Sequence, residues 1–310
     1  MRTTHVIRSD EWLSSVPLHL QLFQELGFKA PKYAHISPIM KNDNGNKRKL
    51  SKRKDPEAAV SYYKEEGIPA EAVKEYLLNI ANSSFENWRK ANLDKKIEEF
   101  DFQLNKMSVS GALFDMVKLL DIGKTVISKM TALEVYEKAL EWAKEYDKEL
   151  EELLNNKEYA LKVFGIERGN SKPRKDISKW SEVKNAMIYM YDEKFVPSKL
   201  TYQDTKITDK QLISKILTLY KEKYFDIEDD KQVWFDKMKD LAEEVGFARE
   251  VKLYKQEPEK WPGHVGDIST MIRVAITGRT NTPDMYEIMK VLGNEAVIAR
   301  ITKTIEELQK

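Results

Sequence analysis

The stretch TALEVYEKALEWAKEYDKELEELL, residues 131–154, decides the fold class of this chain. Thr131 and Glu134 form a capping-box pattern at its start. Apolar side chains then recur three or four positions apart, which is the period of an amphipathic helix: Leu133, Tyr136, Leu140, Ala143, Tyr146, Leu150 and Leu153. The pattern predicts one helix with a charged outer face.

Similar patterns continue after about residue 58. Thr208 and Gln211 repeat the capping pattern, and three glycines mark the ends of later apolar repeats: Gly246, Gly278 and Gly293. The 310 residues include only 12 glycines and 10 prolines, a low share that disfavours a turn-rich all-β fold. The sequence therefore predicts a mainly α protein.

The first 40 residues have a different pattern. Residues 5–7 and 33–40 are strand candidates, and residues 17–26 between them predict a helix that ends at Gly27. The order is β-α-β. Parallel strands are normally buried on both faces among several neighbours, so we expect this segment to be part of a larger sheet.

The composition excludes several classes of protein. The chain has 52 Lys and Arg, 51 Asp and Glu, and no cysteine. It therefore lacks a disulfide scaffold, a Cys-ligated metal site and a thiol nucleophile, and it is not a uniformly polybasic nucleic-acid binder. No apolar run approaches the ~20 residues of a membrane span, and no signal-peptide stretch is present. We expect a soluble, cytoplasmic protein of roughly two domains that does not bind membranes.

The charge is uneven between residues 41 and 54, where seven basic residues accompany one acid, Asp43. Asn44 and Gly45 predict a turn-forming loop rather than a helix face. A mobile loop carrying Lys49 and Lys52 can close over polyphosphate, because ammonium groups neutralise charge that develops during attack at phosphorus. A solvated basic turn or a nuclear-localisation-like tract is the alternative interpretation.

Residues 49–53, Lys-Leu-Ser-Lys-Arg, resemble the KMSKS signature of class I aminoacyl-tRNA synthetases, in the form usual in glutamyl-tRNA synthetases. We call them the signature loop. Residues 4–13, 110–115 and 273–279 are similar to further segments of bacterial glutamyl-tRNA synthetases, in the same order along the chain. The resemblance implies ATP-dependent activation of glutamate to an acyl-adenylate, followed by transfer to the terminal adenosine of tRNA.

The resemblance also implies roles for single residues. It assigns the catalytic roles to Lys49, Ser51 and Lys52, and it places Leu50 and Lys52 at the ATP. Arg8 corresponds to an arginine that contacts the glutamate carboxylate, which suits bidentate guanidinium geometry.

Glu11 and Trp12 correspond to positions near ATP. Core packing is an equal alternative for Trp12. The four histidines share no metal-ligand spacing, so ATP with Mg²⁺ is expected as substrate, and no protein-bound metal is expected.

For tRNA, the resemblance implies contacts from Arg53, Arg174 and Lys175. The last two lie in a basic stretch, residues 168–179, in which a solvated turn is the alternative for any single residue. The expected partners are tRNA(Glu), with tRNA(Gln) as an alternative, ATP and L-glutamate, and we expect a monomer.

The family's His-x-Gly-His signature is absent from this sequence, and the near match at Gly263-His264 lies in the wrong context. We therefore expect the C-terminal portion of a synthetase, without the first half of its Rossmann fold and inactive alone. Its expected divisions are a Rossmann remnant (1–40), the signature loop with a helical stem-contact domain (41–130), and two helical anticodon-binding subdomains (131–225 and 226–310).

Two other functions stay open at the level of sequence. One is a stand-alone, non-catalytic tRNA-binding module. The other is a helical scaffold without a nucleic-acid role. Binding of tRNA that weakens steeply with salt would exclude only the scaffold.

Overall fold

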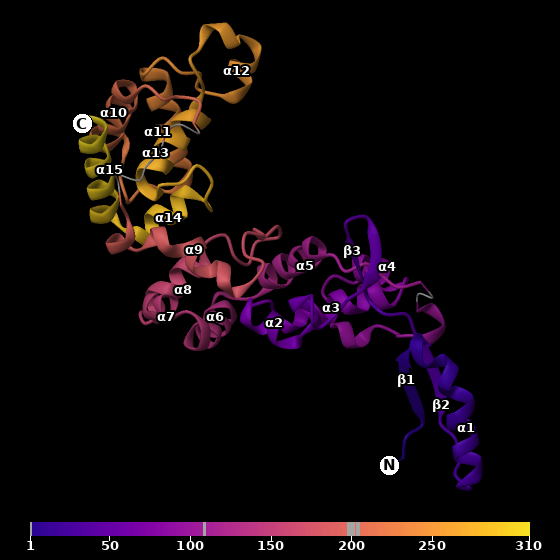
Figure 1. Cartoon of the computed structure of the whole chain (residues 1–310). Coiled ribbons are helices and arrows are strands. Elements are labelled where there is room, and N and C mark those ends of the chain that lie inside the picture. The colour runs from indigo at the N-terminus through magenta and orange to yellow at the C-terminus, as the bar shows by residue number, and fades with distance from the viewer. Residues whose placement is uncertain (1, 108–109, 197–201, 203–204) are drawn as a thin grey trace. The chain divides into compact units, whose positions relative to one another are not determined.

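The computed structural model describes residues 2–107, 110–196, 202 and 205–310 (Figure 1). Met1, at the start of the first expected domain, lies outside the described residues, as do residues 197–201 and 203–204 of the region expected to be helical. The chain forms two compact units. Unit 1 comprises Met1–Ile127 and Ile177–Ser181, and unit 2 comprises Ser128–Asp176 and Glu182–Lys310.

Unit 1 contains short strands followed by helices. Its strands are β1 His5–Ser9, β2 Lys32–Ile36, β3 Met40–Asp43 and β4 Asn46–Lys49. Its helices are α1 Val16–Glu25, α2 Val60–Glu65, α3 Ala70–Ala81, α4 Phe85–Ala91 and α5 Met116–Lys129, the last residues of which belong to unit 2.

The predicted β-α-β order at the start of the chain is confirmed. β1 and β2 pair in parallel, from His5 opposite Lys32 to Ser9 opposite Ile36, and α1 connects them. Gly27 follows the helix with φ +68°, a conformation that costs glycine little. None of residues 2–54 is buried, so the two strands and α1 have no enclosed core among the described residues.

The core of unit 1 lies in its helical part. Ile68 and the α3 residues Ala72 and Tyr76 pack with Leu119 of α5. The segment Ile177–Ser181 completes this unit, because Trp180 N–H donates to Gly67 O at 2.7 Å and Ser181 Oγ donates to Glu66 O at 2.8 Å.

The regular elements of unit 2 are all helices among its described residues. Its helices are α6 Ala132–Tyr146, α7 Lys148–Leu153, α8 Lys157–Gly165, α9 Val183–Met187, α10 Lys210–Leu219, α11 Lys231–Glu244, α12 Val251–Gln256, α13 Val265–Thr277, α14 Met285–Leu292 and α15 Asn294–Leu308. A π-helical turn, Tyr220–Tyr224, extends α10. α10, α13 and α15 pack on one another around a continuous apolar core (Figure 1). The mainly α fold class is thus confirmed.

Helix boundaries differ from the predicted ones where a short polar side chain satisfies backbone donors. The single helix predicted over residues 131–154 is wrong: Asp147 leaves the helical conformation and accepts from Leu150 N–H, so α6 ends and α7 begins there. The capping box of Thr131 and Glu134 is confirmed. The cap predicted at Thr208 is one residue early, because Asp209 accepts from the first turn of α10.

The segment from residue 41 onward is also more ordered than the predicted loop. Residues 40–49 form the antiparallel hairpin β3–β4, with Met40 opposite Lys49 and Asp43 opposite Asn46. Asn44 and Gly45 make the turn with positive φ, as the Asn-Gly pair favours. The loop proper is therefore confined to the residues that follow Lys49.

No helix among the described residues has the length and apolar character needed to cross a membrane.

Candidate functional site

The signature loop leaves the hairpin β3–β4 and turns sharply. Leu50 N–H donates to Ile39 O at 2.9 Å, which continues the hairpin by one residue. Lys54 N–H and Asp55 N–H then both donate to Ser51 O, at 3.1 and 2.8 Å. The three signature-loop residues with proposed catalytic roles therefore lie at the end of a strand and in the turn that follows.

The hairpin itself is joined to the rest of unit 1 through backbone contacts. Met40 N–H donates to Ala112 O, and Phe114 N–H donates to Met40 O, both at 2.8 Å. Gly111 is required at this crossing, because a Cβ there would lie 2.6 Å from Pro38 O. The segment at residues 110–115 thus supports the strand that leads into the signature loop.

Several of the basic residues between 41 and 54 are neutralised by carboxylates. Lys41 contacts Asp55 and Glu57, and Arg48 contacts Asp43 and Asp55. The hydrogen bonds from Arg48, with smaller contributions from Ser51 N–H and Lys41, hold the pKa of Asp55 well below its usual range against the opposing effect of desolvation.

Other basic side chains in this region are not paired with carboxylates. Lys47, Lys52, Arg53 and Lys54 form no ion pair within 4.0 Å among the residues that the structure describes. Arg53 N–H approaches Ser51 Oγ at 3.4 Å. The structure therefore separates the basic residues that hold the hairpin, Lys41 and Arg48, from basic residues whose side chains face solvent, of which Lys52, Arg53 and Lys54 lie in the turn.

Lys49 contacts Glu11, one of the two residues predicted to lie near ATP. Its Nζ lies 2.5 Å from Oε2 of Glu11, in the 3₁₀ segment that follows β1. Trp12 is 54% exposed. Its ring is therefore not packed in a core formed by the described residues. The Arg8 guanidinium lies 5.8 Å from the Trp12 ring centroid.

Arg8 is held in place from several sides. Its Nε donates to His35 Nε2 at 3.1 Å, its Nη1 lies 3.0 Å from His19 Nδ1, and its guanidinium stacks 5.0 Å from the ring centroid of Tyr33. Its Nη2 is buried and has no hydrogen-bond partner among the described residues. A buried guanidinium nitrogen without an acceptor is costly, and a carboxylate could satisfy it.

In unit 2, Arg174 is oriented by hydrogen bonds to Asp176, Asn281 and Thr282. Its Nε donates to Asp176 Oδ2 at 2.6 Å, its Nη2 donates to Asp176 Oδ1 at 3.1 Å, and its Nη1 donates to Thr282 O at 2.8 Å. Asp176 raises the pKa of Arg174. Lys175 beside it is exposed.

The rest of the basic stretch at residues 168–179 does not share these partners. Arg168 is drawn inward, where its Nη1 donates to Met130 O at 2.9 Å, and burial lowers its pKa. Lys179 belongs to unit 1 and pairs there with Glu66. The sequence therefore suggested a larger basic surface than these side chains provide.

Two further arginines accompany Arg174, and we call the three the arginine cluster: Arg174, Arg273 and Arg279. The Arg279 guanidinium lies 4.9 Å from the Tyr189 ring centroid, and the charges of all three arginines act on Tyr189. Burial, followed by repulsion from Arg174, lowers the pKa of Arg273. Its Nε is buried without a hydrogen-bond partner among the described residues.

The sequence contained a partial signal for these residues. Arg273 and Arg279 flank the stretch at residues 273–279 that carries part of the family resemblance. Nothing in their spacing indicated that they would share Tyr189 with Arg174, because about a hundred residues separate the two stretches.

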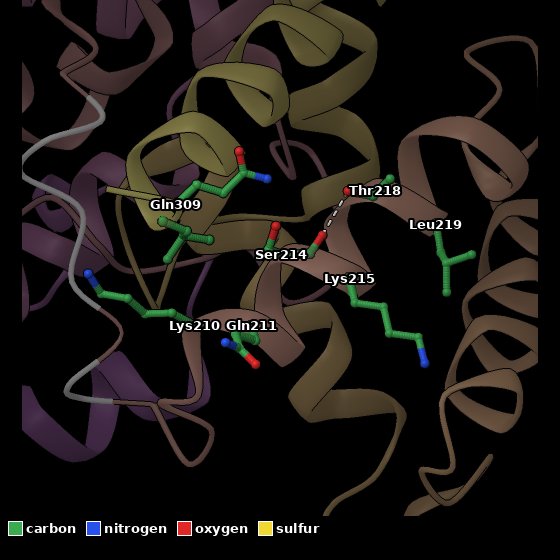
Figure 2. A pocket seen from close by; sticks show the side chains of 8 residues that line it. Lys210, Gln211, Ser214, Lys215, Thr218, Leu219 and Gln309 are labelled. Atoms are coloured by element: carbon green, nitrogen blue, oxygen red, sulfur yellow. Dashed lines mark hydrogen bonds between the residues drawn. The ribbon is translucent and has the colours of Figure 1, made fainter.

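Unit 2 also has a surface pocket of about 630 Å³ (Figure 2). It is lined from α10 and the end of α15 by Lys210, Gln211, Ser214, Lys215, Thr218, Leu219, Leu308 and Gln309. Thr218 Oγ1 donates to Ser214 O at 2.9 Å. No residue assigned a role from the sequence lines this pocket. No group of three or more His, Cys, Asp or Glu side chains suited to a metal ion occurs among the described residues.

Comparison with known proteins shows which proteins the chain resembles. Residues 1–121 match the family of tRNA synthetases class I (E and Q), catalytic domain, and residues 263–305 match the anticodon binding domain family. The chain is 51% identical to a glutamate–tRNA ligase of Clostridium perfringens over 97% of this chain and 55% of that protein. It is 46% identical to one of Sorangium cellulosum, over 98% of this chain and 55% of that protein.

A solved structure agrees in fold. The crystal structure of a glutamate tRNA ligase from Elizabethkingia meningosepticum in complex with its amino acid matches 98% of this chain and 57% of that protein, with a TM-score of 0.67 at 24% identity. The chain thus spans about half the length of the curated relatives that it matches. Over that span it is a homologue of the glutamate–tRNA ligases, with segments of their class I catalytic and anticodon-binding domains.

Proposed function

We propose that the protein takes part in ATP-dependent attachment of L-glutamate to tRNA(Glu), with tRNA(Gln) as a second candidate acceptor, in the cytoplasm. The observation that carries the proposal is the selective neutralisation of the basic residues around the signature loop. Arg48 and Lys41 form ion pairs with the buried carboxylate of Asp55. Lys52 and Arg53 form no ion pair within 4.0 Å among the described residues, and their side chains are exposed in the turn. Free cations on a fixed turn suit a polyphosphate.

In this proposal Lys49, Ser51 and Lys52 act on the phosphates, and Leu50 contributes its backbone. ATP arrives with Mg²⁺, which neutralises part of the phosphate charge. Stabilising the charge that develops at phosphorus needs positioned cations more than a protein base.

Arg8 binds the substrate carboxylate through its unsatisfied Nη2. Glu11 and Trp12 lie beside the nucleotide, since Lys49 and Arg8 contact them directly. The tight support of Arg8 by His19 and His35 favours this role, because a pre-oriented guanidinium loses little entropy on binding.

We assign tRNA binding to Arg53, Arg174 and Lys175, and add Arg273 and Arg279. Single-stranded loop bases are read by stacking and by hydrogen bonds to their edges, and guanidinium groups can do both. The proposed divisions are a Rossmann remnant (1–40), the signature loop with a stem-contact domain (41–130), and two anticodon-binding subdomains (131–225 and 226–310). We propose that the protein acts as a monomer.

A stand-alone tRNA-binding module is the second candidate, favoured by the arginine cluster alone. Two binding measurements on the 310-residue chain separate the candidates. Fluorescence anisotropy with labelled tRNA(Glu) tests the interaction with RNA, and calorimetric titration with Mg·ATP tests the signature loop.

We expect both ligands to bind, with tRNA affinity falling as salt rises. Binding of tRNA(Glu) without any binding of Mg·ATP would support the module. Absence of both would contradict the proposed function, and equal affinity for a tRNA of unrelated anticodon would contradict the assignment of the arginine cluster.

A further inference from the structure

Asp55 is the first buried residue among those that the structure describes, and both oxygens of its carboxylate accept hydrogen bonds. Asp55 lies two residues after the end of the signature loop, and 2% of the residue's surface is exposed. Four donors reach its two oxygens. Arg48 donates in bidentate fashion, Nη1 to Oδ2 at 2.7 Å and Nη2 to Oδ1 at 2.9 Å.

The other two donors come from different parts of the site. Lys41 Nζ, on β3, lies 3.0 Å from Oδ1. The backbone N–H of Ser51, within the signature loop, donates to Oδ2 at 2.8 Å. One carboxylate therefore connects both strands of the hairpin to the middle of the signature loop.

The backbone of Asp55 closes the same turn from the other side. Its N–H donates to Ser51 O at 2.8 Å. Ser51 is thus held twice by Asp55, through its N–H and through its carbonyl oxygen. Because Lys52 and Arg53 lie between Ser51 and Asp55 in the chain, these contacts hold their backbone although their side chains are exposed.

We propose that Asp55 is the positioning residue of the signature loop, which presents Lys52 to polyphosphate through its contacts with Arg48, Lys41 and Ser51. The inference rests on the proposed function and deepens it. Asp55 does not touch the substrate in this proposal. Its charge matters because two cations and one amide share its oxygens, and charge-assisted hydrogen bonds are the stronger kind.

The test compares Asp55→Asn with a matched control in the same unit. Asn keeps the size of Asp but loses the charge and one acceptor, so it cannot satisfy the guanidinium of Arg48. The control is Glu75→Gln, which removes another carboxylate that is bidentate with an arginine. Glu75 is 8% exposed, and its oxygens lie 2.8 and 2.6 Å from Nε and Nη2 of Arg89.

The first readout is tryptic cleavage after Lys52 and Arg53, with the cut sites located by mass spectrometry. The bond after Lys54 is left out, because the substitution changes the residue that follows it. Rates are divided by those of synthetic peptides spanning residues 47–62 of each variant. Thermal unfolding of each protein reports general loss of stability.

We expect Asp55→Asn to raise cleavage after Lys52 and Arg53 by about tenfold, and Glu75→Gln to change it by less than about twofold. Asp55→Glu keeps the charge, so its cleavage rate after Lys52 and Arg53 should lie between the rates of the wild type and Asp55→Asn. Equal cleavage in wild type and Asp55→Asn, or an equal rise in Glu75→Gln, would overturn the proposal.

The second readout is the affinity for Mg·ATP. Asp55→Asn should weaken it by about tenfold while Glu75→Gln leaves it unchanged. A loosened loop with undiminished ATP affinity would overturn the positioning role. If the wild type binds no ATP, the proposed function fails, and the cleavage result still decides whether Asp55 fixes the loop.

Arg48→Lys covers the case in which Asp55→Asn does not fold. It retains a cation beside Asp55 but loses the bidentate contact, so it should raise cleavage in the same direction by a smaller factor. A folded Arg48→Lys protein with wild-type cleavage would contradict the proposal.

Discussion

Lys49 and Glu11 are 38 residues apart in the sequence and form an ion pair, with Lys49 Nζ 2.5 Å from Glu11 Oε2. Both side chains are about half exposed. The first lysine of the signature loop is therefore already occupied by a carboxylate. In the proposed function, an incoming phosphate has to compete with Glu11 for this ammonium group.

Removing the competing charge should strengthen polyphosphate binding. We expect Glu11→Gln to bind inorganic pyrophosphate and Mg·ATP up to about fivefold more tightly, since an exposed ion pair contributes less than about 1 kcal/mol. Isothermal titration calorimetry measures both affinities. Glu86→Gln, which removes an exposed carboxylate 2.9 Å from Lys90, is the control. Weaker ATP binding by Glu11→Gln would mean that Glu11 assists the nucleotide.

The arginine cluster should contribute to RNA affinity in a salt-dependent way. We expect Arg174→Ala to weaken tRNA(Glu) binding by about tenfold and to lower the slope of log affinity against log salt by about one. Fluorescence anisotropy at several salt concentrations provides both values. Arg249→Ala is the control, because Arg249 is also ion-paired in unit 2, with Asp240 at 2.6 Å. Equal losses in the two variants would argue against a specific role of Arg174.

Arg300 should be a large contributor to the stability of unit 2. It is 2% exposed, and its Nη1 donates to Tyr189 O at 2.7 Å and to Ile276 O at 2.8 Å. Arg300→Met leaves both carbonyl groups without this donor, so we expect the free energy of unfolding to fall by about 3 kcal/mol. Urea denaturation followed by circular dichroism measures it. Lys303→Met, an exposed change on the same helix, should have little effect.

Gly123 should be irreplaceable where α5 meets the segment Ile177–Ser181. A Cβ on Gly123 would lie 2.3 Å from Ser178 O. We expect Gly123→Ala to destabilise unit 1 by about 2 kcal/mol, because backbone on both sides has to move. Gly165→Ala is the matched control in α8, where a Cβ would meet nothing within 4 Å, and helix propensity favours Ala by up to about 1 kcal/mol. Thermal unfolding measures both variants: the melting temperature should fall for Gly123→Ala and rise for Gly165→Ala.

The buried tyrosines should set the alkaline limit of the fold. Burial raises the pKa of Tyr63, Tyr159 and Tyr189 to about 12 in each case, whereas a free phenol ionises near pH ~10. Because the folded-state pKa is the higher one, this contribution to stability is complete below pH ~10 and is lost as the pH rises toward 12. Phenolate absorbance should therefore rise in two steps, and unfolding should accompany the second. A single step near pH ~10 in a folded protein would contradict this.

The parts of the fold that sequence predicts well are those in which one physical signal dominates. Apolar spacing located the helices of unit 2, and the Thr131 and Glu134 capping box set the start of α6 correctly. The break at Asp147 is not visible in the apolar spacing, which continues through it. It arises because the Asp147 side chain accepts a hydrogen bond from Leu150 N–H and so caps a new helix.

The site was harder to predict than the fold. The hairpin β3–β4 has almost no apolar alternation, since its strands read Met-Lys-Asn-Asp and Asn-Lys-Arg-Lys. Its order comes from backbone pairing and from carboxylates that bind Lys41 and Arg48. The basic run therefore looked mobile in the sequence, because Asp55, the acid that binds Lys41 and Arg48, falls just outside it.

The absence of any buried residue among residues 2–54 also has a calorimetric consequence. The heat capacity change of unfolding grows with the apolar surface that becomes exposed to water, and this segment already exposes such side chains as Leu18, Leu22 and Phe28. Its unfolding should therefore add little to the heat capacity change of the chain. The heat capacity change of unfolding should come mainly from the helices that follow residue 54, whose apolar side chains are buried.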